Sequence, residues 1–124
     1  MIIYGLSYIK NQFNSVEFEI GINENKISCI EYKNEYLAKN NMKKALFCNT
    51  LSEVLKSNAA LCEYIIPNIN ILKDSVLLAE KYLFDSKILT LATNDEAIVK
   101  AANVGVDCVL IKEFDEKYKE YFIG

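Results

Sequence analysis

The sequence predicts a three-layer α/β/α protein with a mainly parallel sheet of four to five strands, preceded by an N-terminal antiparallel β-hairpin. After about residue 44, apolar runs of strand length alternate with stretches of helical periodicity, a pattern typical of right-handed βαβ crossovers. Earlier, residues 16–22 alternate apolar and polar side chains with period two, as a half-buried strand does. We expect one domain over residues 1–124, with the hairpin region in 1–33 and the alternating region in 34–124.

The first third of the chain is expected to be β-structure. Residues 2–7 form a short apolar run without a basic leader or a small-residue cleavage site, so we interpret it as a strand and not as a signal peptide. The alternating segment 16–22 is followed by the turn-forming residues 23–25 and then by a second apolar run at 27–32. This order predicts two antiparallel strands joined by a turn.

From residue 34 onward, strands and helices are expected in turn. Thr50 and Glu53 have the spacing of a capping box, which predicts a helix start. Asn94 can cap a later helix, and Gly105 can end that helix in the left-handed conformation. Strands are expected at 45–48, 62–67, 87–93 and 107–111, and helices at about 35–42 after Asn34, from 51 onward, up to about Phe84, after Asn94, and after Asp115 with Tyr118, Tyr121 and Phe122.

Composition excludes several classes of chemistry. The chain contains no His and no Arg and has a net charge of −3. The missing His excludes a Ser-His-Asp triad and a His-ligated metal. The missing Arg and the acidic balance argue against a nucleic-acid partner, and no apolar run is long enough to span a membrane. The cysteines form no C-x-x-C pair, so we expect reduced core residues in a cytoplasmic protein, with no metal site and no cofactor; they are Cys29, Cys48, Cys62 and Cys108.

Polar residues at the expected carboxyl ends of the strands are the candidates for a site, because open parallel sheets bind ligands there. Lys112, at the end of the last strand, could form a Schiff base or bind an anion, or it could be a solvated side chain. Helix capping and turn formation are the alternative explanation for the others. The full candidate set is Glu31, Asn34, Asn49, Asn68, Thr90, Thr93, Asp95 and Lys112.

Residues 87–114, KILTLATNDEAIVKAANVGVDCVLIKEF, resemble the fourth strand, fourth helix and G-A-D-x-y-l-x-K-P-F segment of response-regulator receiver domains, which have a flavodoxin-like fold. Gly105 and Lys112 have the family's separation. The resemblance implies that Lys112 would contact a phosphoryl group. It also implies that Thr90 or Thr93 would be the Thr or Ser that ends the fourth strand in that family.

Elsewhere the sequence departs from the receiver pattern. Glu31 and Tyr32 stand where the family has two acidic residues, Pro67 and Asn68 stand near the place of the phospho-accepting Asp, and Glu113 replaces the usual proline. The resemblance therefore implies a degenerate receiver without phosphotransfer. The same segment also resembles a strand–helix–strand unit of (β/α)-barrel enzymes, but a whole barrel needs roughly 200 residues or more.

Three functions follow from these observations. The first is a non-catalytic regulatory or protein-interaction domain that resembles a receiver lacking its phospho-acceptor. The second is a small-molecule-binding protein or enzyme subunit with its site at the carboxyl ends of the strands. The third is a subunit that pairs with a protein partner or a second copy through the N-terminal hairpin, because an uncovered edge strand recruits another strand. A deep pocket at the carboxyl edge would favour the second function, and an edge covered by side chains would favour the first.

Overall fold

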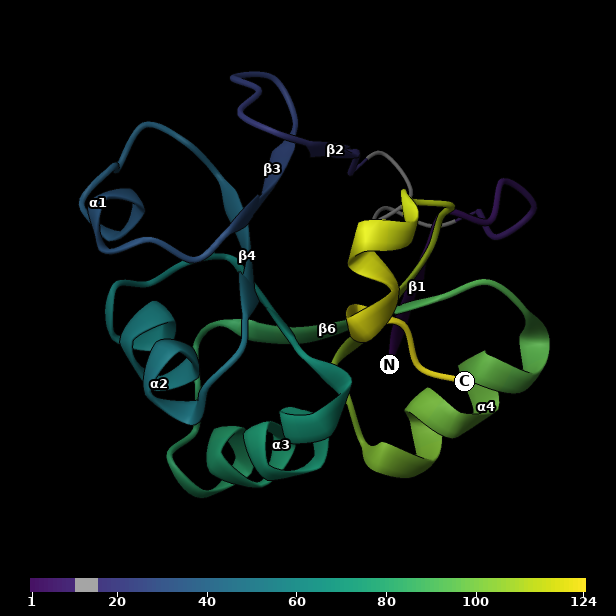
Figure 1. The fold of residues 1–124 in the computed structure, drawn as a ribbon. Coiled ribbons are helices and arrows are strands. Elements are labelled where there is room, and N and C mark those ends of the chain that lie inside the picture. Colours follow the sequence, from purple (N-terminus) through teal and green to yellow (C-terminus); the bar gives the residue numbers. More distant parts are fainter. Residues whose placement is uncertain (11–15) are drawn as a thin grey trace.

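The computed structural model describes residues 1–10 and 16–124, which contain one curled sheet of seven parallel strands (Figure 1). The strand order is β1-β7-β6-β5-β4-β3-β2. The strands are β1 (Ile2–Tyr4), β2 (Phe18–Ile20), β3 (Ile27–Glu31), β4 (Lys44–Cys48), β5 (Tyr64–Pro67), β6 (Lys87–Ala92) and β7 (Cys108–Ile111). The helices are α1 (Asn34–Leu37), α2 (Leu51–Ala59), α3 (Leu72–Lys81) and α4 (Asp95–Val104), with 3₁₀ turns η2 (Ile69–Ile71) and η3 (Glu116–Tyr121).

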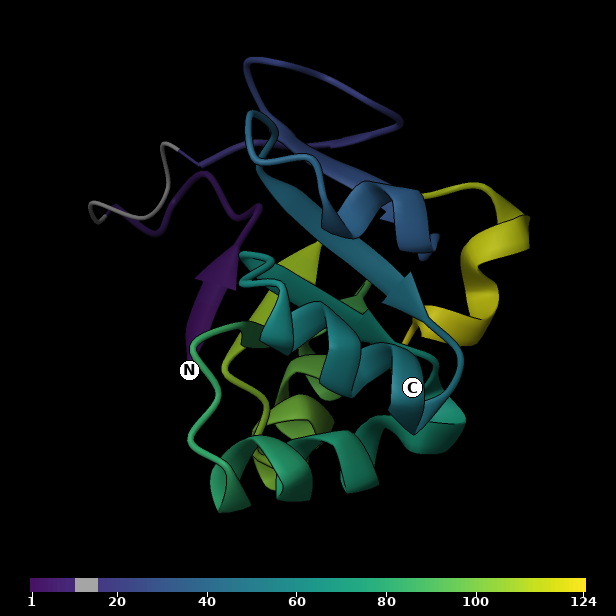
Figure 2. The same ribbon diagram turned by 90° about the vertical axis from the view of Figure 1, so that its left-hand side faces the viewer.

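The three-layer arrangement expected from the sequence is wrong, because the α-helices cover only one face of the sheet (Figures 1 and 2). From β2 to β7 each strand lies beside the next in sequence, so the direction of winding never reverses. Crossovers of constant hand that wind in one direction place their helices on the same face. The reversal that defines a flavodoxin-like sheet is absent from this order, and the one-way winding is instead that of a (β/α)-barrel.

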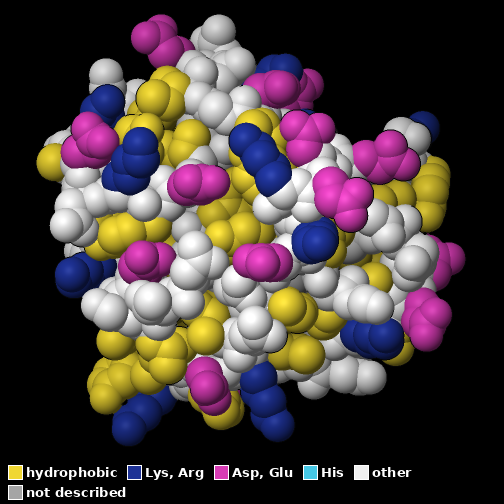
Figure 3. Space-filling view, in the orientation of Figure 1, with side chains coloured by type: hydrophobic (Ala, Val, Ile, Leu, Met, Phe, Trp, Pro, Cys, Tyr) yellow, Lys and Arg dark blue, Asp and Glu magenta, His cyan; other side chains and the backbone are white. Residues whose placement is uncertain are grey.

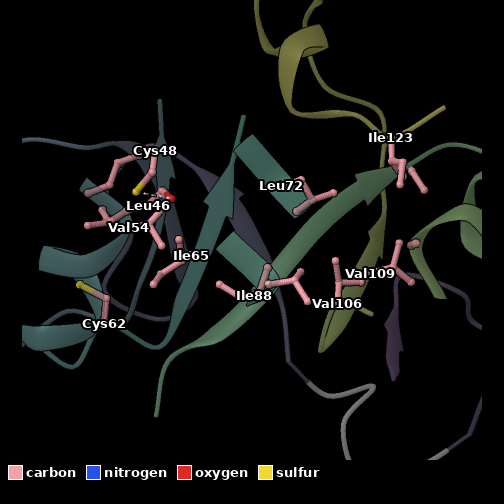
Figure 4. Packing of buried hydrophobic residues seen from close by; sticks show 14 of the residues in the cluster. Leu46, Cys48, Val54, Cys62, Ile65, Leu72, Ile88, Val106, Val109 and Ile123 are labelled. Atoms are coloured by element: carbon pink, nitrogen blue, oxygen red, sulfur yellow. Dashed lines mark hydrogen bonds between the residues drawn. The ribbon is translucent and has the colours of Figure 1, made fainter. Parts of the chain in front are cut away.

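Both faces of the sheet are nevertheless buried, as the continuous apolar strands predict. On the outer face, strand side chains such as Leu46, Ile65 and Val109 pack against Val54 of α2 and Leu72 of α3 (Figure 4). On the inner face the curl brings strand side chains against one another. The inner cluster comprises Tyr4, Phe18, Ile27, Cys29, Ala45, Phe47, Tyr64, Ile66, Leu89, Leu91, Cys108 and Leu110, joined by Tyr118 and Tyr121 of η3.

The prediction of an N-terminal antiparallel hairpin is also wrong, since β2 and β3 are parallel, with Phe18 opposite Ile27. A single reversal would give antiparallel strands, and this connection reverses twice. Gly21 takes a φ of +89° directly after β2. The expected turn then forms as the second reversal, where the Asn25 N–H donates to Asn23 Oδ1 at 2.8 Å. Because both strands are short, the residues between Ile20 and Ile27 are enough to carry the chain back for a parallel pairing.

The helix ends predicted from local sequence signals are confirmed in most places. The Thr50 hydroxyl accepts a hydrogen bond from the Glu53 N–H, Asn94 Oδ1 accepts from the Ala97 N–H, and Gly105 is left-handed with a φ of +93°. The last helix is a 3₁₀ helix, and Asp115 at its start makes no side-chain capping bond. Asn34 is the first residue of α1 and does not cap it. No helix in the described part of the chain is long and apolar enough to cross a membrane.

Candidate functional site

The carboxyl ends of β3 to β6 form the mouth of the curled sheet, and residues 113–124, the C-terminal segment, lie across it (Figures 1 and 2). Two tyrosine rings of η3 cover the Phe47 ring at the end of β4. Tyr118 stacks on it with a centroid separation of 4.9 Å and an angle of 27°, and Tyr121 lies at 4.7 Å and 54°. Phe114 adds an edge contact to Phe47 at 6.5 Å. The inner end of the mouth is therefore filled by the chain's own aromatic side chains.

Two of the predicted site residues, Asn49 and Asn68, meet at this mouth. Asn68 Nδ2 donates to Asn49 Oδ1 at 3.2 Å, as expected for residues that follow neighbouring parallel strands. The same Asn49 oxygen accepts from the Tyr121 hydroxyl at 2.8 Å, and Asn68 Nδ2 also donates to Glu120 Oε2 at 3.3 Å. Burial raises the pKa of Tyr121, although its hydrogen bond to Asn49 lowers it, so this phenol stays protonated. The two amides are thus bonded to the C-terminal segment.

The other predicted residues do not join this cluster. Glu31, Thr93 and Asp95 are exposed, and Asn34 accepts a hydrogen bond from the Tyr32 hydroxyl at 2.7 Å. Thr90 is fully buried in the middle of β6, and its hydroxyl has no hydrogen-bond partner. Since Leu89 and Leu91 point inward, Thr90 points to the helix-covered face and away from the mouth.

Lys112 lies where the two edge strands of the sheet, β1 and β2, approach each other, and not in the mouth. We call this place the seam. The Lys112 Nζ donates to the carbonyl oxygen of Phe18 in β2 at 2.6 Å and sits 5.7 Å from the Phe114 ring centroid. The seam also contains a cavity of about 320 Å³, lined by residues after β1, along β2 and at the end of β7. A lysine that satisfies an edge carbonyl in this way protects the edge from pairing with other chains.

A groove of about 510 Å³ runs beside the C-terminal segment at the start of α4. Thr93 is the predicted site residue that lines it, and its charged side chains are Glu113, Asp115, Glu116 and Lys119. Neither amide of the mouth and no second predicted residue faces this groove. It therefore does not assemble the strand-end site expected from the sequence.

The buried nucleophiles are held in their neutral forms. Burial raises the pKa of the Cys29, Cys48 and Cys108 thiols to about 12, and for Cys29 nearby Lys112 opposes this rise. Burial also raises the pKa of the Tyr4 and Tyr64 phenols, whose hydroxyls share a hydrogen bond of 2.9 Å. A thiol reacts as its thiolate, so burial lowers the reactivity of these three thiols. Within residues 1–10 and 16–124, no three His, Cys, Asp or Glu side chains group as metal ligands.

Sequence reasoning missed the aromatic residues that close the mouth. Tyr118 and Tyr121 were expected on a last helix, and their spacing of three residues did place them on one face of it. Their contact with Phe47 depends on where the chain turns after β7, which no local signal records.

Two exposed leucines at the opposite end of the sheet have strained backbone. Leu61, after α2, has a φ of 60° and is 67% exposed, and Leu83, after α3, has a φ of 51° and is 84% exposed. Their turns adjoin, because the Ser86 N–H donates to Asn58 Oδ1 and its hydroxyl donates to the Cys62 carbonyl. Figure 3 shows hydrophobic side chains at the lower left, near the turn that follows α3.

No family model matches this sequence, and no curated protein matches it.

Proposed function

We propose that this chain is a non-catalytic protein-interaction domain. The observation that supports the proposal is the closed mouth of the sheet. At the edge where parallel α/β sheets bind small molecules, the Phe47, Tyr118 and Tyr121 rings fill the space. The polar groups predicted to bind a ligand there, Asn49 and Asn68, are hydrogen-bonded to that closure.

The two left-handed leucines support a protein-contacting surface at the amino-terminal side of the sheet. A left-handed backbone costs a leucine on the order of 1–2 kcal/mol, and neither Leu61 nor Leu83 recovers this by burial. Strain of this kind is typical of functional positions. A partner that buries both side chains would give them the missing stabilisation, at about 25 cal/mol for each Å² removed from water.

The leucine surface can be tested by replacing Leu61 and Leu83 together with Asn, which tolerates the left-handed conformation. We expect the isolated double variant to be at least as stable as wild type in thermal unfolding. In source cells, we expect wild type to migrate in a complex larger than its own 14.2 kDa, and the double variant to leave that complex. Val99→Asn is the matched control, because Val99 is 59% exposed on the regular backbone of α4.

Two results would overturn this proposal. One is a chain that runs as a monomer in source cells; a complex that survives the double substitution would instead rule out Leu61 and Leu83 as the contact surface. The other is phosphotransfer. We expect incubation with acetyl phosphate, or with beryllofluoride and Mg²⁺, to label no carboxylate and to leave the spectrum of the protein unchanged. A labelled carboxylate would restore the receiver function implied by the sequence resemblance.

A further inference from the structure

The C-terminal segment takes the place of a strand beside β6. Only the first two residues of β6 pair with β5, and the two strands are unpaired beyond that point. There, Phe122 forms a parallel bridge with Leu91, and the Ile123 N–H donates to the Leu91 carbonyl at 2.9 Å. The chain therefore adds two extended residues, Phe122 and Ile123, to its own sheet, with the main-chain geometry seen in peptide recognition by strand addition.

Side chains of this segment enter both hydrophobic clusters. Tyr118 and Tyr121 lie in the inner cluster against Phe47. Ile123 lies on the outer face with Leu72 and Val109 (Figure 4). Specificity would thus come from the rings of the 3₁₀ turn and from Ile123, while the main-chain bond of the extended residues provides affinity that does not depend on sequence.

The C-terminal segment has fewer main-chain pairings to the sheet than any of the strands β1 to β7. The segment has a single bridge to the sheet, whereas each named strand pair has two to four paired positions. The link from Lys112 to Asp115 has no regular structure. Elements with few main-chain bonds open at a lower free energy than the core. We therefore expect the segment to open at a lower free energy than the rest of the sheet.

We propose that the mouth is a peptide-recognition site that the C-terminal segment occupies in cis. A partner would bind there by replacing it with a segment of the same pattern, in which a 3₁₀ turn is followed by two extended residues. That pattern is two aromatic residues three positions apart, followed directly by an aromatic and an aliphatic residue, as in Tyr118, Tyr121, Phe122 and Ile123. The Asn49 and Asn68 amides, now bonded to Tyr121 and Glu120, would bond to the incoming peptide. This is a second contact surface, separate from Leu61 and Leu83.

Hydrogen exchange on the full-length wild-type chain tests the opening. The Ile123 amide, bonded to Leu91, should exchange at least tenfold faster than the Asp107 amide, which is bonded to the Ile88 carbonyl at 3.1 Å between β6 and β7. The faster exchange should depend little on urea, because a local opening exposes little surface. Equal exchange of the two amides through global unfolding would overturn the proposal.

Peptide binding tests the recognition. A fluorescent peptide with the sequence of residues 112–124 should bind full-length Tyr118→Ala at least tenfold more tightly than wild type, because the intact cis segment competes at a high effective concentration. A control peptide carrying Tyr118→Ala and Tyr121→Ala should not bind. If Tyr118→Ala does not fold, Phe122→Ala serves as the weakened chain. Equal binding of the two peptides would contradict the proposal and would leave the leucine surface unaffected.

Discussion

Thr90→Val should stabilise the protein. The hydroxyl of Thr90 is fully buried on the helix-covered face of β6 and has no partner. An unsatisfied buried polar group costs about 1–3 kcal/mol. Valine has nearly the same shape and places a methyl group there, so little repacking is needed between Ile88 and Ala92. Taking the lower part of that range to allow for imperfect fit, we expect a gain of about 1 kcal/mol in the free energy of unfolding and a rise in Tm of about 4 °C.

Urea denaturation followed by circular dichroism measures this gain as a higher midpoint with an unchanged slope. Thr93→Val is the control, because Thr93 is an exposed threonine directly after β6. It should change the free energy of unfolding by less than about 0.5 kcal/mol. Thr50→Val should cost about 1 kcal/mol, because it removes the cap on the Glu53 N–H. A loss of stability in Thr90→Val would show that its hydroxyl is bonded, and the reasoning from an unpartnered group would fail.

Two further predictions concern backbone and ionisation. Gly5→Ala should cost more than about 2 kcal/mol, because its Cβ would stand 2.2 Å from the Ile111 carbonyl oxygen. Gly21→Ala, at a similar φ with nothing within 4 Å, should cost only about 1 kcal/mol of backbone strain; equal losses in urea denaturation would contradict this. Stability should also fall as pH rises above about 9, because the unfolded thiols ionise near 9.0 while burial raises their folded pKa to about 12. Each thiol then contributes roughly 1.4 kcal/mol per pH unit, and a flat profile of unfolding free energy between pH 9 and 11 would refute it. The thiols concerned are those of Cys29, Cys48 and Cys108.

Elements that depend on neighbouring residues could be predicted from the sequence. The caps at Thr50 and Asn94 and the left-handed end at Gly105 were correct, because each bond joins residues within one helical turn. The apolar runs from 45 onward became strands because both faces of the sheet are buried, and continuous hydrophobicity reports burial. These signals carry no information about which strand lies beside which.

Strand direction was mistaken at the N-terminal region for a physical reason. The alternation in 16–22 shows that one face of a strand is buried, and it is equally compatible with a parallel or an antiparallel neighbour. Two reversals, at Gly21 and at Asn23 to Asn25, separate the observed parallel pair from a hairpin. The turn-forming residues from Asn23 predict that the chain reverses there, but they do not indicate how many reversals separate the two strands.

The pairing of Asn49 and Asn68 could be predicted from the sequence, whereas their contact with the C-terminal segment could not. Asn49 and Asn68 come together because parallel strands end at one edge, which the order of strands and helices already implies. Their partner Tyr121 is 72 residues beyond Asn49 in sequence, and its position depends on the curl of the whole sheet. Lys112 was placed correctly at the end of β7, but the curl brings it to β2 and not to a ligand.

The mouth is closed because the interior of the curled sheet is narrow. Seven short strands enclose a narrow interior, and the inner cluster fills it with rings and aliphatic side chains, so Phe47 would face water if nothing covered it. A phenylalanine side chain gains about 1.5–3 kcal/mol from burial, and the segment also covers its own Tyr118 and Tyr121. An empty mouth is therefore costly, and the segment leaves only rarely unless something replaces it. A replacement has to present aromatic rings to Phe47 and main-chain groups to Leu91, as the segment does now. The chemistry that completes the fold would thus also set the specificity of the proposed recognition.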